Sequence, residues 1–280
     1  DREPTQLLKA YDDLYVMALS TAYTEPSLIQ QSNPDKAIRD AGADCVTRGA
    51  AVITKLGMSR PIYERLQKVA GSPLDSKLRY MVATQLDNYK RAGVDRDEAT
   101  RKRVAELSDQ ITATTIEFSK NIAEDVRSIE ARPDELKGLP QDFLAKLPAA
   151  ENGVVRIPVT GANLSPVMKY AESEALRKGM LTAFNDRAFP ANDAVFKRLL
   201  ALRAEQARLL GYPTYAAFDT ANRTAKEPAR VQAFIDDIAG AARPIPETEA
   251  ATLLPRLNQD GAGASALPSW STSYASRLVK

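Results

Sequence analysis

The chain has 280 residues, and its 38 Lys and Arg side chains nearly balance its 36 Asp and Glu side chains. This balance excludes a global attraction to nucleic acid or to an anionic membrane, and no apolar run approaches the roughly 20 residues of a membrane-spanning helix. Histidine is absent, which excludes Ser-His-Asp catalysis, Cys-His catalysis and histidine-ligated zinc from these residues.

Two amphipathic helices are predicted at the start of the chain. Apolar side chains recur at spacings of three and four over residues 7–19, and a second stripe runs over residues 35–53. Tyr11 and Tyr15 fall on the first stripe. We expect these two tyrosines to belong to a core rather than to a binding site.

Two further helix starts follow. Pro61 suits the first turn of a helix that starts at Ser59, because the missing N–H of proline would have no partner there. Ser72 fits an N-cap, with Asp75 as the acid three residues later. Gly93 is expected to end the helix that this cap begins.

The longest predicted element is a helix from about residue 95 to residue 131, roughly 50 Å long at 1.5 Å per residue. A coiled coil is the alternative, but Thr114 and Thr115 interrupt the apolar seam. We therefore favour a long helix packed inside a larger helical domain. Its apolar stripe comprises Val104, Leu107, Ile111, Phe118, Ile122, Val126 and Ile129.

One strand is predicted, over residues 154–159. This run is rich in β-branched side chains and follows the turn dipeptide Asn152-Gly153. Its partner is expected in neighbouring chain, which gives a small hairpin. Before it, Pro133 ends the long helix, and a turn at residues 138–140 leads into a short helix through residues 143–147.

Helices dominate the remainder of the chain. The patterns predict helices over residues 165–186 and 193–210, a short helix after Pro213, and a further helix from about residue 228 that ends before Pro244. Val231, Phe234, Ile235 and Ile238 line one face of the last helix. Residues 260–266 are small and polar, as linkers and surface loops are. The expected fold class is therefore all-α, a mainly helical multi-helix lobe with one small β-hairpin.

Motifs that carry chemistry are absent from the sequence. There is no H-E-x-x-H, C-x-x-C, G-x-S-x-G or phosphate-binding glycine loop. Cys45 is the single cysteine, which excludes an intrachain disulfide, and as a catalytic thiol it would need a basic partner such as histidine. We expect Cys45 to be a buried or half-buried small apolar residue. No catalytic, cofactor-binding or metal-binding residue is assigned within the chain.

Short sequence blocks nevertheless follow one another in a characteristic order. They are Leu28-Ile29-Gln30-Gln31, Gly57-Met58-Ser59, Ile62-Tyr63-Glu64-Arg65, Lys120-Asn121, Glu124-Asp125, Glu135-Leu136-Lys137-Gly138-Leu139-Pro140, Pro166-Val167-Met168-Lys169, Ala183-Phe184-Asn185, Ala207-Arg208-Leu209-Leu210-Gly211-Tyr212 and Phe234-Ile235-Asp236-Asp237. In order and spacing they resemble the thimet oligopeptidase and neurolysin family of zinc metallopeptidases, with its oligopeptidase A and dipeptidyl carboxypeptidase relatives. The chain departs from the family's Trp-Asp and paired tyrosines, having Trp270-Ser271 and Tyr274-Ala275 instead.

The resemblance implies a function. The chain is expected to be the N-terminal, non-zinc-binding half of a zinc-dependent oligopeptidase that hydrolyses short peptides in a deep channel. The family's zinc ion would be held by ligands beyond residue 280, so this fragment alone is expected to be inactive. The implied partners are the missing C-terminal catalytic half and short peptide substrates, with no nucleic acid and no membrane.

The resemblance also implies an organisation of the chain. Residues 1–94 would form an N-terminal helical lobe, and residues 95–165 a long helix, turn and hairpin that pack on the catalytic lobe. Residues 166–280 would continue the N-terminal lobe and stop before the zinc motif, inside a helix at Lys280.

Two further expectations concern the function and the location. A stand-alone helical module that binds peptides without hydrolysing them, or serves as a scaffold, is the alternative function. A cytoplasmic location is expected. Because the chain begins at Asp1 rather than Met, a periplasmic or exported protein is the alternative location.

Overall fold

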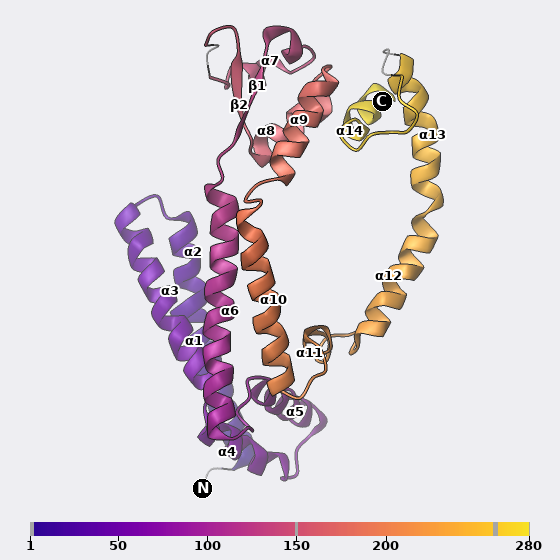
Figure 1. Cartoon of the computed structure of the whole chain (residues 1–280). Helices are drawn as coiled ribbons and strands as arrows, with labels where there is room; N and C mark the ends of the chain where they lie inside the picture. Colours follow the sequence, from indigo (N-terminus) through magenta and orange to yellow (C-terminus); the bar gives the residue numbers. More distant parts are fainter. Residues whose placement is uncertain (1–2, 149–150, 260–262, 280) are drawn as a thin grey trace. The chain divides into compact units, whose positions relative to one another are not determined.

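The computed structural model, drawn in Figure 1, describes residues 3–148, 151–259 and 263–279. The chain divides into two compact units. Unit 1 comprises Asp1–Asp109 and Glu205–Pro213, and unit 2 comprises Gln110–Ala204 and Thr214–Lys280. Helices α6 (Glu98–Glu124) and α10 (Ala191–Leu209) contribute residues to both units. The expected fold class is confirmed, because the described residues are mainly helical and include a two-stranded antiparallel sheet.

Unit 1 is a set of helices that begin at polar or proline residues. Before α6 it contains α1 (Pro4–Leu19), the π-helical turn η1 (Ser20–Thr24), α2 (Glu25–Ser32), α3 (Lys36–Gly57), α4 (Arg60–Ala70) and α5 (Ser76–Arg91). The predicted start of α3 is confirmed, since the Asp35 carboxylate accepts the backbone N–H groups of Ala37 and Ile38. The predicted N-cap Ser72 is wrong. The chain stays non-helical until Asp75, whose Oδ1 accepts the N–H of Leu78 at 2.8 Å.

The core of unit 1 lies between α1, α4 and α5. It consists of Leu8, Tyr63, Leu66, Val69, Leu74, Val82, Tyr89 and Val94. The predicted stripe of α1 misses part of this arrangement, because Leu8 is 1% exposed whereas Leu14 is 43% exposed. Toward its C-terminal end α1 contacts α3, and there its buried residue is the small Ala18.

Helices α2 and α3 lie side by side (Figure 1), and a glycine of α3 stands at their contact. A Cβ atom at Gly42 would lie 3.0 Å from the carbonyl oxygen of Pro26 and 3.1 Å from the amide nitrogen of Gln30, so glycine allows this close approach. Gly42 and Gly49, two turns apart, are the buried residues of α3. Our expectation for Cys45 is wrong, because it is exposed. The contact face of α3 follows its glycines and not its larger apolar side chains.

Unit 2 contains the sheet and the remaining helices. In chain order these are β1 (Ser128–Ala131), the 3₁₀ turn η2 (Pro133–Leu136), α7 (Gln141–Leu144), β2 (Val155–Pro158), α8 (Gly161–Tyr170), α9 (Glu174–Asn185), α11 (Tyr215–Thr220), α12 (Pro228–Ala242), α13 (Pro244–Gln259) and α14 (Thr272–Val279). One core joins the sheet to α7, α8 and α9. A smaller core, built on Leu253, Leu257, Tyr274 and Ala275, joins α13 to α14.

The long helix is shorter than predicted, and the lost residues form a strand. α6 ends at Glu124, and β1 pairs antiparallel with β2, with Ile129 opposite Ile157 and Glu130 opposite Arg156. The predicted sheet is therefore confirmed, but its partner strand comes from the segment that we assigned to the helix. Pairing buries Ile157 completely, and this tertiary contact overrides the helical pattern. The predicted turn at residues 152–153 does form, bridging Glu151 to Val154.

Asp125 ties the end of α6 to the junction between α9 and α10. Its carboxylate accepts hydrogen bonds from the Arg127 guanidinium at 2.8 Å and from the backbone N–H of Ala188 at 2.5 Å. Those two hydrogen bonds hold the pKa of Asp125 below its usual range. Close by, the buried Asn192 of α10 donates to the carbonyl oxygen of Phe118 in α6 at 3.0 Å.

The helix predictions for the second half of the chain have mixed outcomes. The helix expected over residues 165–186 is divided into α8 and α9, and Ser173 caps α9 by accepting the N–H of Leu176. The helix predicted from about residue 228 does end before Pro244, at Ala242, and Pro244 then opens α13, where its missing N–H has no cost. The predicted apolar face of α12 is present, but it is exposed, with Phe234 at 66%. Residues 260–262 of the expected linker, and Lys280, lie outside the described residues.

Candidate functional site

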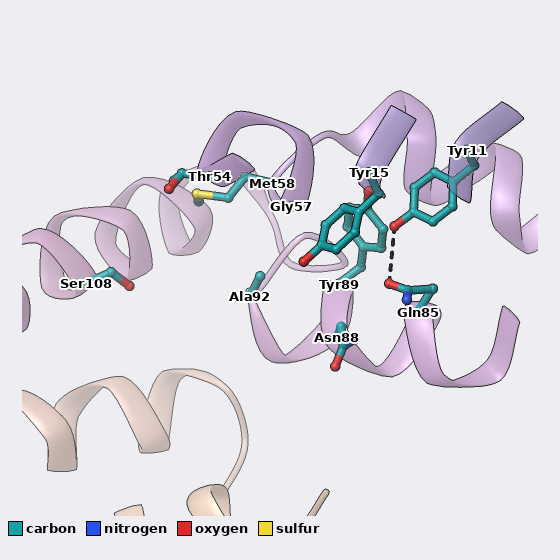
Figure 2. A pocket seen from close by; sticks show the side chains of 10 residues that line it. All are labelled: Tyr11, Tyr15, Thr54, Gly57, Met58, Gln85, Asn88, Tyr89, Ala92 and Ser108. Carbon is teal, nitrogen blue, oxygen red and sulfur yellow. Dashed lines mark hydrogen bonds between the residues drawn. The ribbon is translucent and has the colours of Figure 1, made fainter. Parts of the chain in front are cut away.

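A pocket of about 350 Å³ opens in unit 1 between α1, α5, α6 and the C-terminal end of α3 (Figure 2). It is lined by Tyr11, Tyr15, Thr54, Gly57, Met58, Gln85, Asn88, Tyr89, Ala92 and Ser108. None of these side chains carries a formal charge. The volume lies at the lower end of the range of small-molecule sites.

Aromatic rings form one side of the pocket. Tyr11 and Tyr15 lie one turn apart on α1, with ring centroids 6.3 Å apart and ring planes 23° apart. Tyr89 of α5 donates its hydroxyl to the carbonyl oxygen of Leu56 at 2.9 Å. Our expectation that Tyr11 and Tyr15 belong to a core is therefore wrong in part. Both are half-buried and line the pocket, and Tyr11 also packs on the core of unit 1.

The phenols of Tyr11 and Tyr89 remain neutral at physiological pH. Burial raises the pKa of Tyr11, and the neighbouring Tyr89 raises it further. Burial also raises the pKa of Tyr89, although its interaction with Tyr11 acts in the opposite direction. The Tyr11 hydroxyl donates to Oε1 of Gln85 at 3.2 Å (Figure 2). These groups can therefore bind by hydrogen bonding, but they are poor general acids or bases at pH 7.

Several polar groups in the pocket remain available to a ligand. Among the described residues, no protein group hydrogen-bonds to the hydroxyl of Tyr15, the hydroxyl of Thr54 or the side-chain amide of Asn88. An amide both donates and accepts, and so does a hydroxyl. The arrangement can therefore bind a neutral polar group against aromatic faces, whereas its lining includes no nucleophile paired with a base.

The zinc ion implied by the sequence resemblance does not fit the residues present. In the described ranges, no three Cys, Asp or Glu side chains gather closely enough to hold a metal ion, and histidine is missing from the sequence. Zinc sites need such a cluster of nitrogen, sulfur or oxygen ligands. No step of zinc chemistry is therefore assigned to side chains of this chain.

A second polar site is buried in unit 2 around Arg177 of α9, which is 2% exposed. Its Nη1 donates to the carbonyl oxygens of Ala171 at 2.7 Å and Glu172 at 3.0 Å. Its Nε donates to the carbonyl oxygen of Trp270 at 3.2 Å, and its Nη2 donates to Oγ of Ser271 at 3.0 Å. The guanidinium thereby ties the junction between α8 and α9 to the segment that precedes α14.

The Arg177 site is held together by neutral acceptors. Its guanidinium lies 4.2 Å from the ring centroid of Tyr274, and burial lowers the pKa of Arg177. The indole N–H of Trp270 donates to Oε1 of Glu174 at 2.8 Å, and the Lys178 ammonium lies 4.9 Å from the indole centroid. Sequence reasoning missed this site, because its residues come from two segments far apart in the chain.

Comparison with known proteins shows which peptidases the chain resembles. A sequence profile described as peptidase family M3 matches residues 167–280. Saccharolysin from Saccharomyces cerevisiae is 27% identical over 225 residues, which is 76% of this chain and 31% of that protein. Residues 167–280 of this chain are therefore similar to peptidase family M3. The sequence resemblance to the oligopeptidases is thereby confirmed.

Other M3 relatives match over a similar part of their length. Oligopeptidase A from Haemophilus influenzae is 26% identical over 250 residues, or 82% of this chain and 37% of that protein. Oligopeptidase A from Escherichia coli K12 is 27% identical over 222 residues, or 74% of this chain and 32% of that protein. The chain thus spans about a third of the length of the curated relatives it matches.

The two sites differ in their relation to the M3 profile. The Arg177 site lies within the matched residues 167–280, whereas the pocket-lining residues all precede residue 109. In the described part of the chain, no helix combines the length and the apolar character that crossing a bilayer requires.

Proposed function

We propose that this chain is the N-terminal, non-zinc-binding part of a zinc-dependent oligopeptidase that hydrolyses short peptides in a deep channel. The observation that carries the proposal is the family M3 match, together with relatives whose names identify them as oligopeptidases. Those relatives extend well beyond the matched length, which leaves room for a catalytic part. The zinc ligands belong to that part, beyond residue 280.

Within this proposal the chain binds and encloses peptide rather than cleaving it. Residues 95–165 pack on the catalytic part, and the remaining helices form a wall of the channel. The proposed partners are therefore the catalytic half and short peptides, with neither nucleic acid nor membrane. Since no metal-binding cluster forms among the side chains that the structure describes, hydrolysis in this proposal is assigned to the catalytic part.

The test compares the chain with a longer product of the same gene. The coding sequence is extended downstream of residue 280 to its stop codon, and both proteins are purified. Zinc content is measured by mass spectrometry, and turnover by a short quenched-fluorescent peptide with and without chelator. We expect zinc and chelator-sensitive turnover in the longer protein and neither in the chain alone. A folded protein carrying the same cleavable sequence is the control, and it should resist hydrolysis.

Two outcomes would overturn the proposal. Chelator-sensitive turnover by the chain alone, well above a mock purification, would show that catalysis does not need a further part. A stop codon directly after residue 280, with no H-E-x-x-H reading frame beyond it, would favour the stand-alone peptide-binding or scaffold module.

A further inference from the structure

The pocket of unit 1 has no role in the hydrolysis proposed above, because that chemistry lies outside this chain. It also lies outside the residues matched by the M3 profile. We propose that this pocket is a binding subsite for an uncharged aromatic side chain of a peptide, with tyrosine as the preferred side chain. The proposal rests on the proposed function only in taking a peptide as the ligand.

The charge of the lining selects a neutral ligand. All ten lining residues are uncharged, and burial keeps the phenols of Tyr11 and Tyr89 protonated. A lysine, arginine, aspartate or glutamate side chain would lose its water in the pocket without meeting an opposite charge. The pocket therefore disfavours charged side chains, whatever their shape.

The shape and surface of the pocket favour a flat apolar group. The stacked rings of Tyr11 and Tyr15 and the ring of Tyr89 provide aromatic contact surface (Figure 2). The Met58 thioether adds a polarisable contact of the kind that sulfur makes with aromatic rings. A volume of about 350 Å³ is small for a ligand site, which suits a single side chain rather than a folded surface.

The unpaired polar groups distinguish tyrosine from phenylalanine. The amide of Asn88 and the hydroxyls of Tyr15 and Thr54 have no protein hydrogen-bond partner among the described residues. A ligand hydroxyl can donate to one of these groups and accept from another. A site that hydrogen-bonds a hydroxyl disfavours the analogue that lacks it, since its own polar groups then lose water without a replacement.

The first experiment measures binding to the 280-residue chain by isothermal titration calorimetry and ligand-observed NMR. The probes are the N-acetyl amides of tyrosine, phenylalanine, lysine and glutamate, which differ only in their side chains. For the tyrosine probe we expect a Kd of about 0.1–1 mM, as befits a small ligand. The phenylalanine probe should bind about threefold more weakly, and the lysine and glutamate probes at least about tenfold more weakly.

The second experiment fills the pocket without disturbing the fold. Apart from its chain neighbours and its own helix backbone, a Cβ atom at Gly57 would meet no atom within 4 Å, so Gly57→Leu adds a side chain in open space at a residue that lines the pocket. Gly240 of α12 is an equally open helical glycine far from the pocket in sequence, and Gly240→Leu is the matched control. Gly57→Leu should weaken the tyrosine probe about tenfold or more, whereas Gly240→Leu should leave its Kd unchanged.

A third variant tests the hydrogen bond. Asn88→Leu should abolish the preference for tyrosine over phenylalanine while keeping the preference for neutral over charged probes. The idea is overturned if all four probes bind equally, or if Gly57→Leu binds as tightly as Gly240→Leu with an unchanged circular dichroism spectrum. Because no hydrolysis is measured, these failures are distinct from a failure of the proposed oligopeptidase function.

Discussion

Replacing Arg177 by methionine should destabilise unit 2 by about 3–5 kcal/mol. Methionine keeps the apolar stem of the side chain as far as the position of Nε but removes four hydrogen bonds, to three carbonyl oxygens and to the hydroxyl of Ser271. Hydrogen bonds from a charged donor contribute about 1.5–3 kcal/mol each. The sum is reduced because a buried cation, which is itself costly, also disappears.

The single tryptophan reports this change directly. The Trp270 carbonyl oxygen accepts a hydrogen bond from Arg177, and its indole N–H donates to Glu174, so its fluorescence depends on the docking of this segment on α9. Urea unfolding followed by tryptophan emission gives the free energy of unfolding for wild type and variant. Arg177→Lys keeps the charge with fewer donors, so an intermediate loss is expected.

The control is Arg156→Met in β2. The Arg156 side chain is 64% exposed and pairs with an exposed Glu130 across the sheet, so its loss should change the free energy of unfolding by less than about 1 kcal/mol. If Arg177→Met and Arg156→Met unfold at the same urea concentration, the buried guanidinium does not hold this segment, and the reasoning fails.

Three further predictions concern single positions. Asp75→Ala should lower the free energy of unfolding of unit 1 by about 1 kcal/mol through loss of the α5 N-cap, while Ser72→Ala should leave it unchanged. Equal urea midpoints for the two variants would contradict Asp75 as the N-cap. Gly42→Ala should lower the free energy of unfolding by about 1–2 kcal/mol because its Cβ atom clashes with α2, whereas Gly57→Ala should leave the free energy of unfolding unchanged. Both variants are measured by urea unfolding with circular dichroism. Equal stability of the two variants would contradict the close approach of α2 and α3. The folded-state pKa of Asp125 is lowered, so the ionised carboxylate stabilises the fold above its unfolded pKa of about 3.9, and this stabilisation is lost as the pH falls through the folded pKa. The thermal midpoint of the wild type should therefore exceed that of Asp125→Asn at pH 7. A difference in midpoint that persists at pH 2 would contradict this assignment.

Local sequence signals predicted the helices well where the deciding interaction is itself local. Asp35 begins α3 through hydrogen bonds to residues two and three positions on, and the sequence alone reveals this spacing. The helix before Pro244 ends where predicted, but the sequence did not reveal that Pro244 also opens the next helix, since a proline can do either. Whether Pro244 opens a helix depends on the backbone conformation of the turn that precedes it.

Features that depend on distant contacts could not be predicted in the same way. Residues 128–131 continue an amphipathic helical pattern, and only their pairing with β2 makes them a strand. The sequence offered one sign of this pairing, the opposite charges of Glu130 and Arg156, which form an ion pair across the sheet. These two residues are far apart in the chain, so no local pattern relates them. Whether the apolar face of α12 is covered likewise depends on its neighbours and not on its periodicity.

The candidate pocket gave a weak signal in the sequence. Tyr11 and Tyr15 share a helix face, as do Gln85 and Asn88, but each pair alone is compatible with ordinary core or surface. Their meeting requires α1 and α5 to pack against each other through the core of unit 1. The pocket therefore became visible only when the tertiary structure brought these pairs together.

The long connection between β1 and β2 has a consequence for the order of events during protein synthesis. Roughly 25 residues separate the end of β1 from the end of β2, and ribosomes add about 5–20 residues per second. For about 1–5 s, then, the nascent chain carries β1 with its hydrogen-bonding edge unpaired and Ile129 without its partner. A helix is the alternative open to residues 128–131 in that interval, as their own pattern favours. The emergence of β2 would convert a nascent helix end into a strand, so the sheet and the core built on it cannot form before Pro158 has been added.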